Sequence, residues 1–421
     1  MRRRPYVTAI FLLVLSVWTA AVAEEAALKK DGRWRKVHAR TLSELRRFRP
    51  QPMKLSKYGG AVSGSKAKAT GFFRTARVAG RWWLVDPEGH LFLTVGMCSV
   101  NLSMFKDSEV MKTFDSREAW RKATVELLRA QGFNTLGRWS DADRFRKLDP
   151  PMAYTTSLSF MGAYAKKRDR KNGKPGFPEE CLPVFDPDFE TFCDRYAQKL
   201  AVTKDDPWLL GHFTDNEIPF RPYILKNYLK LSKDDPGRRA AKQFLSERRK
   251  SSNRINKSDE ADFLTLVAKR YYSIVVKAIR KHDPNHLVIG SRVNGRNIND
   301  PVFRGSRPLD VVSINYYHHW SADQKQLDRA AALSGRPILQ SEWYANIDTA
   351  NAGFLVKTQR DRGLFYTNHT LSLLENRNCV GWHWFKYGTH VDRKFRPFTE
   401  MANLMKKVNQ NVYSLANYFM R

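Results

Sequence analysis

The sequence has few cysteines, and no two of them are spaced for metal binding. Its 421 residues include four cysteines, scattered along the chain and without a Cys-x-x-Cys motif. This scarcity excludes a disulfide scaffold and the usual kind of structural zinc site. The chain shows no internal repeat, which excludes a solenoid. No Gly-x-Gly-x-x-Gly motif follows the first predicted strand, which argues against a dinucleotide-binding open sheet.

Acidic residues are also in short supply. The chain has 42 Asp and Glu against 73 Lys and Arg, a formal net charge of +31. Such an excess predicts a polyanionic partner, and composition alone leaves nucleic acid, an anionic membrane surface and an acidic polysaccharide open. Hydrophobic residues make up 42% of the chain, which is enough for a packed core and excludes disorder over most of the length.

The first 23 residues read as a secretory signal peptide. Three arginines at positions 2–4 precede a mostly apolar run at 6–17, and Ala21-Val22-Ala23 forms a small-residue cleavage pattern. The run is short for a membrane anchor, so we predict cleavage, which removes three arginines and lowers the formal charge from +31 to +28. No second apolar stretch of about 18 residues follows. We therefore expect a soluble, secreted or periplasmic protein without stable membrane association, whose partner is a polysaccharide rather than a nucleic acid.

The rest of the chain divides into a basic N-terminal extension at 24–70 and one large domain at 71–421. Within the extension, 59–70 reads as a flexible loop, and 71–96 reads as a short β-meander broken by turns. Eight β-rich runs follow, several of them continuously apolar, as expected for parallel strands buried on both faces. They cover 91–100, 133–139, 153–160, 208–214, 286–293, 311–317, 337–343 and 379–385.

Helical patterns fill most of the gaps between these runs, while 164–183 reads as a long surface loop. Eight strands alternating with helices predict an α/β fold of the (β/α)8 barrel type, a TIM barrel. A doubly wound open sheet is the alternative. In a barrel of this kind the active site lies where the strands end, so the residues that end each run are the candidates for chemistry.

Two carboxylates end predicted strands among aromatic residues. Glu217 follows the fourth run, and Glu342 lies in the seventh. Retaining glycoside hydrolysis needs such a pair, because one carboxylic acid protonates the leaving oxygen while the other carboxylate attacks the anomeric carbon. A lone glutamate among 73 basic residues is better explained as a salt-bridge partner. Two of them, on these strands and with these neighbours, favour catalysis.

Other strand-end residues suit a sugar-binding mouth, because flat aromatic rings pack against the apolar faces of sugars. Arg138 can bind a sulfate or carboxylate, or form a structural salt bridge with Asp141 or Asp143, and both interpretations stay open. Basic clusters at 166–171 and 238–250 form either a solvated surface or a rim for a polyanion. His318, His319, His383 and His390 favour sugar or surface roles over metal binding, so we predict no metal and no cofactor. The candidate binding residues are Asn101, Arg138, Trp139, Asn216, Tyr316, Tyr344, Trp382, His383 and Trp384.

Five segments in sequence order resemble the β-agarases of glycoside hydrolase family 50 and their relatives in clan A. They lie at 80–89 (GRWWLVDPEG), 132–141 (GFNTLGRWSD), 211–217 (GHFTDNE), 342–345 (EWYA) and 380–385 (VGWHWF). The resemblance covers roughly residues 71–390. The chain departs from the family in being much shorter than its typical members, which carry an additional N-terminal β-rich domain. Its charge is the second departure, because neutral agarose gives such a charge no evident purpose.

This resemblance implies roles for individual residues. Glu217 is expected to be the acid/base and Glu342 the nucleophile. Asn216 is expected to hydrogen-bond the 2-hydroxyl of the sugar at the cleavage point, and Tyr316 to hold the carboxylate of the nucleophile. Either Trp384 or Trp382 is expected to form the sugar platform.

Together these observations predict a secreted, agarase-like retaining glycoside hydrolase that cleaves a β-linked galactan in a sulfated or otherwise acidic form. Another clan A activity, such as that of a β-galactosidase or a mannan hydrolase, is the alternative among enzymes. A non-catalytic polyanion-binding protein is the alternative outside them.

Overall fold

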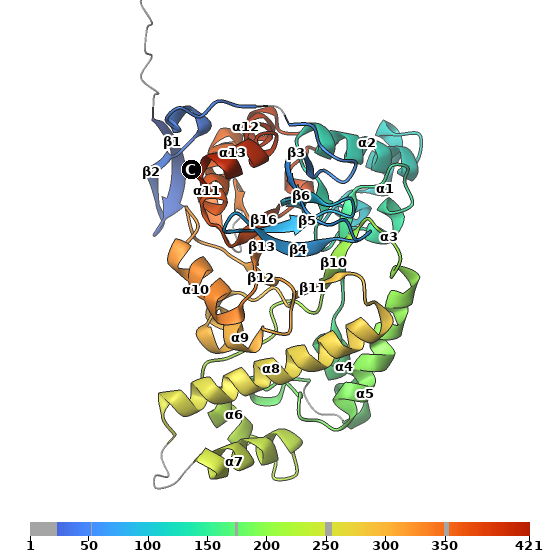
Figure 1. Ribbon diagram of the computed structural model, residues 1–421, viewed down its shortest axis with the longest axis vertical. Coiled ribbons are helices and arrows are strands. Elements are labelled where there is room, and N and C mark those ends of the chain that lie inside the picture. Colours follow the sequence, from blue (N-terminus) through green and yellow to red (C-terminus); the bar gives the residue numbers. More distant parts are fainter. Residues whose placement is uncertain (1–22, 52, 173–175, 249–254, 349–352) are drawn as a thin grey trace, which may run out of the picture.

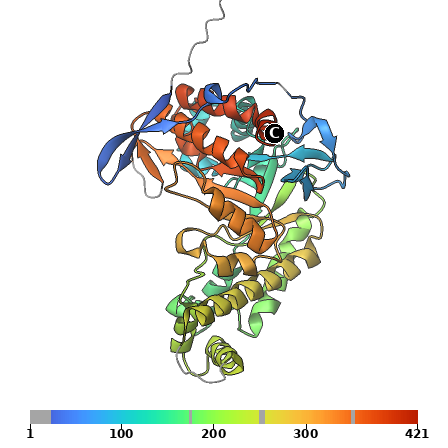
Figure 2. The same ribbon diagram turned by 60° about the vertical axis from the view of Figure 1, so that its left-hand side comes forward.

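The computed structural model describes residues 23–51, 53–172, 176–248, 255–348 and 353–421. All but the last residue of the predicted signal peptide lies outside these described residues. A barrel-like sheet occupies the centre of the molecule, and helices surround it (Figure 1). The helices α6 (Ile224–Lys230) and α7 (Pro236–Arg248) lie beyond the long helix α8 (Lys257–His282), at the end of the molecule farthest from the N-terminal strands (Figures 1 and 2).

Eight parallel strands form the central sheet and confirm the predicted (β/α)8 barrel. Their order is β11-β10-β9-β8-β7-β16-β13-β12. A parallel bridge between Val293 and Ile314 joins the two end strands and closes the barrel. Each of the eight falls inside a predicted run. The strands are β7 Thr94–Met97, β8 Thr135–Leu136, β9 Ala153–Ser157, β10 Leu209–Phe213, β11 Leu287–Gly290, β12 Val312–Asn315, β13 Ile338–Trp343 and β16 Cys379–Trp384.

Helices follow most of the strands and pack around the sheet. Local sequence sets their ends: the Ala119 amide donates to the Ser116 side chain and starts α2, and Gly335 ends α10 in a left-handed conformation. The helices are α1 Asp107–Thr113, α2 Arg117–Ala130, α3 Ala142–Phe145, α4 Phe160–Asn172, α5 Asp188–Ala197, α6 Ile224–Lys230, α7 Pro236–Arg248, α8 Lys257–His282, α9 Asp300–Gly305, α10 Gln324–Ser334, α11 Gln359–Glu375, α12 Thr399–Asn409 and α13 Val412–Tyr418.

Two predictions about local structure are wrong. The surface loop expected at 164–183 is helical at its start, because α4 runs to Asn172. Its buried Phe160 and Tyr164 anchor the helix, and lysine and arginine are good helix formers. The flexible loop expected at 59–70 contains strand β3, Ala61–Lys66, which pairs with the meander.

The predicted meander is present and closes one end of the barrel. Its strands are β4 Arg74–Val78, β5 Arg81–Val85 and β6 His90–Phe92, in a sheet of order β3-β6-β5-β4. Phe73, Leu84 and Phe92 share one apolar cluster with side chains near the starts of the barrel strands, including Leu287 and Val380. The meander therefore covers the N-terminal end of the barrel and leaves the opposite end for a site.

The N-terminal extension is paired to a segment far along the chain. The hairpin of β1 Glu24–Lys30 and β2 Arg33–Ala39 joins β15 Phe354–Val356 and β14 Ala345–Asn346 in a sheet of order β14-β15-β1-β2. This sheet lies beside α11 (Figure 1). The division into an extension at 24–70 and a domain at 71–421 stays a prediction.

Over the described part of the chain, no helix combines the length and the apolar character needed to cross a membrane.

Candidate active site

Glu217 lies at the mouth of the barrel, just beyond the end of β10. It is half-buried, and its backbone adopts a left-handed conformation with φ of 55°. Its amide donates to the carbonyl of Ser291 at 3.0 Å, which ties the loop after β10 to the end of β11. The Nδ2 group of Asn315, at the end of β12, donates to Glu217 Oε1 at 2.7 Å. The donor to this carboxyl group is therefore a neutral amide.

Glu342 lies in β13 and is 8% exposed. The guanidinium of Arg292 donates to Oε2, and the hydroxyl of Tyr317 donates to Oε1, both over short distances. A full positive charge and a phenol thus face this carboxylate, whereas a neutral amide holds Glu217 in the described part of the chain. Arg292 and Tyr317 fix the orientation of the Glu342 carboxylate, and Asn315 fixes that of Glu217.

Arg292 bonds both to Asn216, the neighbour of Glu217, and to Glu342. It was not among the residues predicted from the sequence. This side chain is 0% exposed and follows β11. Its Nη1 donates to Asn216 Oδ1 at 3.0 Å, while Nη2 donates to the Ser341 carbonyl at 3.2 Å and to Glu342. The sequence does contain one indication of its role. Arg292 lies within the fifth predicted run, and a cation buried in a strand requires an acidic or hydrogen-bonding partner.

The tyrosine that holds Glu342 is Tyr317, so the assignment of this role to Tyr316 is wrong. Asn315 and Tyr317 face the barrel mouth, and the residue between them points the other way. The Tyr316 ring stacks on His319, with 3.9 Å between ring centroids, and its hydroxyl faces the backbone of Asp323 instead of Glu342. Burial and the Glu342 carboxylate raise the pKa of Tyr317 far above its ordinary value, so its hydroxyl stays protonated and donates.

Replacement of Tyr317 by Phe is expected to reduce kcat about 10- to 100-fold, because a hydrogen bond to a charged group contributes about 1.5–3 kcal/mol. Tyr316→Phe is the matched control and is expected to keep the wild-type kcat, since its hydroxyl bonds to nothing in the site. Steady-state kinetics of both variants on one substrate checks the assignment. A greater loss of kcat in Tyr316→Phe than in Tyr317→Phe would reverse it.

Neither Trp382 nor Trp384 forms an open sugar platform. Both are buried on the helix side of β16, at 1% and 0% exposure, because alternate strand residues share a face. The Trp382 indole donates to the Tyr366 hydroxyl of α11 at 2.8 Å, and Trp384 packs edge-on against Trp343. The aromatic that stays partly exposed after β16 is Phe385, which the sequence analysis did not single out.

His383 points into the barrel below the site. It is 0% exposed, and its Nε2 lies 2.9 Å from the Thr94 hydroxyl. Its ring occupies the space that a side chain would need at Gly96, where an added Cβ would lie 2.2 Å from the ring. Burial lowers the pKa of His383 to about 3, so the ring is neutral. This residue supports the floor of the site and does not reach a sugar.

Trp139 and Tyr344 remain as accessible aromatics at the mouth. Trp139 is 48% exposed, and Tyr344 is half-buried beside the rings of Tyr317 and Phe385. Asn101 positions Trp139, because its Nδ2 donates to the Trp139 carbonyl at 2.6 Å. Asn101 is thus a supporting residue in this structure, whereas Trp139, Tyr344 and Phe385 offer faces to a sugar.

Arg138 forms neither of the predicted salt bridges. Asp141 lies 3.9 Å from Arg121, and Asp143 lies 3.6 Å from Arg146. Arg138 itself is 4% exposed and donates to the Asp215 carbonyl at 3.2 Å. Its guanidinium lies 4.3 Å from the centroid of the Trp139 ring. Burial lowers the pKa of Arg138 to about 10, and the side chain supports Trp139 from below.

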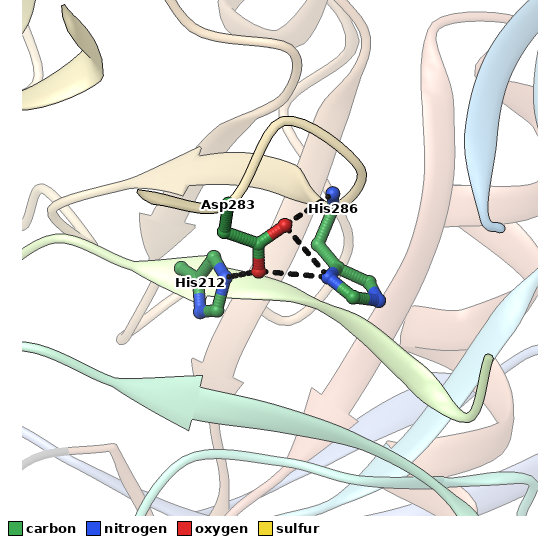
Figure 3. Close-up of side chains that lie close together, drawn as sticks. All are labelled: His212, Asp283 and His286. Atoms are coloured by element: carbon green, nitrogen blue, oxygen red, sulfur yellow. Dashed lines mark hydrogen bonds and ion pairs between the residues drawn. The ribbon is translucent and has the colours of Figure 1, made fainter. Parts of the chain in front are cut away.

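One cluster outside the mouth has the residue types of a metal site. His212, Asp283 and His286 are all buried, and Asp283 lies between the two rings (Figure 3). His212 Nε2 lies 2.7 Å from Asp283, and His286 Nδ1 lies 2.8 Å from the same oxygen. The remaining ring nitrogens face the hydroxyl of Thr156 and the carbonyl of Asp206. Because every ring nitrogen already has a partner, the cluster is best described as a hydrogen-bond network that ties α8 to β10.

Comparison with known proteins gives the chain β-agarase relatives. β-Agarase B of Vibrio sp. (strain JT0107) is 25% identical over 95% of this chain and 54% of its own length. β-Agarase A of the same strain is 23% identical over 73% of this chain and 41% of its own length. The chain thus spans about half the length of these curated relatives. No protein-family model matches it.

A solved structure matches the chain over almost its full length. The crystal structure of BpGH50 superposes with a TM-score of 0.85 and 28% identity, covering 94% of this chain and 96% of that one. In sequence and in fold, therefore, the chain is similar to β-agarases and to a structure named for glycoside hydrolase family 50, as its five sequence segments indicate.

Proposed function

We propose that the chain is an exported retaining glycoside hydrolase of the β-agarase type, which cleaves a β-linked galactan in a sulfated or otherwise acidic form. The observation that carries the proposal is the pair Glu217 and Glu342 at one barrel mouth, each held by side chains from β11 and β12 that lie between them. The similarity to β-agarases supports the choice of sugar. The signal-peptide pattern supports export.

In the first step of the proposed reaction, a carboxylate oxygen of Glu342 attacks the anomeric carbon. Glu217 gives its proton to the glycosidic oxygen as the bond between that oxygen and the anomeric carbon breaks. A covalent ester links the sugar to Glu342, and the shortened chain leaves as an alcohol. Arg292 and Tyr317 orient the attacking carboxylate before the reaction and release it as its charge is lost.

In the second step Glu217 acts as a base. It takes a proton from a water molecule, whose oxygen attacks the anomeric carbon and displaces Glu342 as a free carboxylate. Two inversions leave the configuration of the sugar unchanged. Arg292 fixes the amide of Asn216 through Oδ1, which leaves the Asn216 Nδ2 group to donate to a sugar hydroxyl.

The acidic form of the substrate is proposed from charge. A formal charge of +31, or +28 after cleavage at Ala23, attracts a polyanion and repels a polycation. Trp139, which is exposed, and Phe385, which is partly exposed, offer apolar contacts to sugar rings in addition to the charge. Together they favour a polymer that combines sugar rings with sulfate or carboxylate groups.

The test is reducing-sugar release from agarose, porphyran, carrageenans and uncharged β-mannan across a salt series. We expect the fastest release from a sulfated galactan, falling several-fold between about 0.1 M and about 1 M salt as the Debye length shrinks from about 10 Å to about 3 Å. Agarose is the uncharged control, and its cleavage is expected to change little with salt. A salt-insensitive preference for a neutral polymer would remove the acidic substrate. Failure to cleave any galactan would overturn the activity.

A further inference from the structure

The solvent face of the sheet β14-β15-β1-β2 carries a tryptophan surrounded by lysines. Trp34 in β2 pairs directly with Lys29 in β1. The Lys357 amide, just after β15, donates to the Ala27 carbonyl, and its ammonium lies 5.2 Å from the centroid of the Trp34 ring. Lys36 lies two residues along the same strand. We call these four side chains, Lys29, Trp34, Lys36 and Lys357, the hairpin patch.

The patch is exposed because the other face of the sheet is buried. Ala26 and Leu28 point toward α11 and are 0% and 3% exposed, and alternate residues of a strand face opposite ways. Trp34 is 41% exposed, and the three lysines of the patch are exposed. A single exposed aromatic is common on protein surfaces, so the distinctive feature of this face is the combination of the Trp34 ring with three exposed lysines.

The surroundings of the patch are strongly positive. Lys30, Arg33 and Arg35 are exposed near the turn of the same hairpin and alternate with the patch residues, so they project from the opposite face. The hairpin has three acids: Asp31 at the turn, Glu24, which pairs with Arg360, and Glu25, which pairs with Lys36 at 3.1 Å. Both partners of this ion pair are more than half exposed, so an anionic ligand exchanges readily with the Glu25 carboxylate.

The patch is also close to the proposed cleavage site along the sheet. β14 begins directly after Tyr344, and Glu342 lies in the strand before it. Three strand spacings separate β14 from β2, or about 15 Å at about 4.8 Å each. The hairpin lies at the edge of the molecule, and its turn end projects outward (Figure 2).

We propose that the hairpin patch is an accessory binding surface for the anionic polysaccharide, separate from the catalytic mouth. Trp34 stacks on a sugar ring, and Lys29, Lys36 and Lys357 bind sulfate or carboxylate groups on the same polymer. The inference rests on the proposed function, because it takes the substrate class from there. It gives the aromatic and the cationic side chains of this face one common ligand.

The test is polymer binding by affinity electrophoresis in gels that contain porphyran or agarose, with Glu342→Gln as the parent so that no substrate is consumed. Trp34→Ala is expected to weaken porphyran retention about 5- to 10-fold and agarose retention by a similar factor. The double variant Lys29→Gln/Lys357→Gln is expected to weaken porphyran retention several-fold at low salt and to leave agarose retention unchanged. Trp34→Tyr, which keeps a ring, is expected to retain most of the binding.

A matched control removes an exposed lysine elsewhere. Lys122 in α2 pairs with Glu118 on the surface, and Lys122→Gln is expected to bind as the parent does. Circular dichroism of each variant checks the fold. Parental retention by both Trp34→Ala and the double variant would overturn the proposal, as would stronger binding of duplex DNA or anionic vesicles than of porphyran at this hairpin. Reducing-sugar release is measured separately, with the catalytically active protein. Absence of this release would contradict the proposed function, whereas unchanged polymer retention by the patch variants would contradict the patch.

Discussion

Glu342→Gln is expected to lower kcat by about 10⁴-fold or more, the scale at which an enzyme loses the nucleophile of a covalent mechanism. The amide has the shape of the carboxylate but cannot attack the anomeric carbon. Binding is expected to survive, because the change leaves the aromatic faces of Trp139 and Phe385 in place. Reducing-sugar release from the galactan that the wild type cleaves best is the measurement.

Added azide distinguishes the roles of the two glutamates. With an activated aryl glycoside and Glu342→Ala, whose short side chain leaves room at the anomeric carbon, azide replaces the missing nucleophile and gives a glycosyl azide of inverted configuration. With Glu217→Ala, the covalent ester still forms and azide attacks it, so the product keeps its configuration. Wild-type turnover in either variant would contradict the proposed mechanism, and exchanged configurations would exchange the roles.

Arg292→Met is expected to lower kcat about 10²- to 10³-fold, the range for removing one preorganised donor from a reacting charge. It is also expected to lower the free energy of unfolding by about 3–5 kcal/mol, because Glu342 loses the cation of a buried pair. Arg292→Lys keeps the charge but cannot reach Asn216 and Glu342 together, so we expect an intermediate kcat.

Arg81→Met is the matched control for the loss of a buried guanidinium. Arg81 is 1% exposed and donates to the carbonyls of Leu374 and Cys379, far from the mouth. Its replacement is expected to reduce the free energy of unfolding without lowering kcat. If Arg292→Met kept the wild-type kcat, Arg292 would be a structural residue alone.

The barrel could be predicted because the strands of a parallel sheet have a recognisable sequence pattern. Strands buried on both faces are continuously apolar, and the eight runs stand apart from the polar helices between them. Glu217 and Glu342 could be predicted from the same pattern. A carboxylate at the end of an apolar strand is costly to bury, so it indicates a functional role. Arg292 was hidden by composition, because one more arginine among 73 basic residues carries little signal.

The continuously apolar character that identifies the strands does not show which of their residues face the barrel interior. Where both faces are apolar, no alternation of polar and apolar residues shows which residues of the strand face the barrel mouth, so the sequence pattern did not correct the assignment of this role to Tyr316. Trp382 and Trp384 were misjudged likewise, and only the packing of α11 against β16 shows that both face outward. The helix α4 was missed because a run of lysines and arginines resembles a loop until Phe160 and Tyr164 are seen to be buried.

The pairing of β1 with β15 also bears on how the chain reaches its native state. Leu28 lies opposite Val356, so the first strand finds its partner only after nearly the whole chain has been made. Contacts so distant in sequence form slowly, because a long loop must close before they contribute any stability. Until then the hairpin has an open edge and is free to pair with other chains. If the protein is exported, pairing of β1 with β15 would be a late event that follows translocation. Until then, the positive charge on the hairpin would oppose pairing of its open edge with other chains.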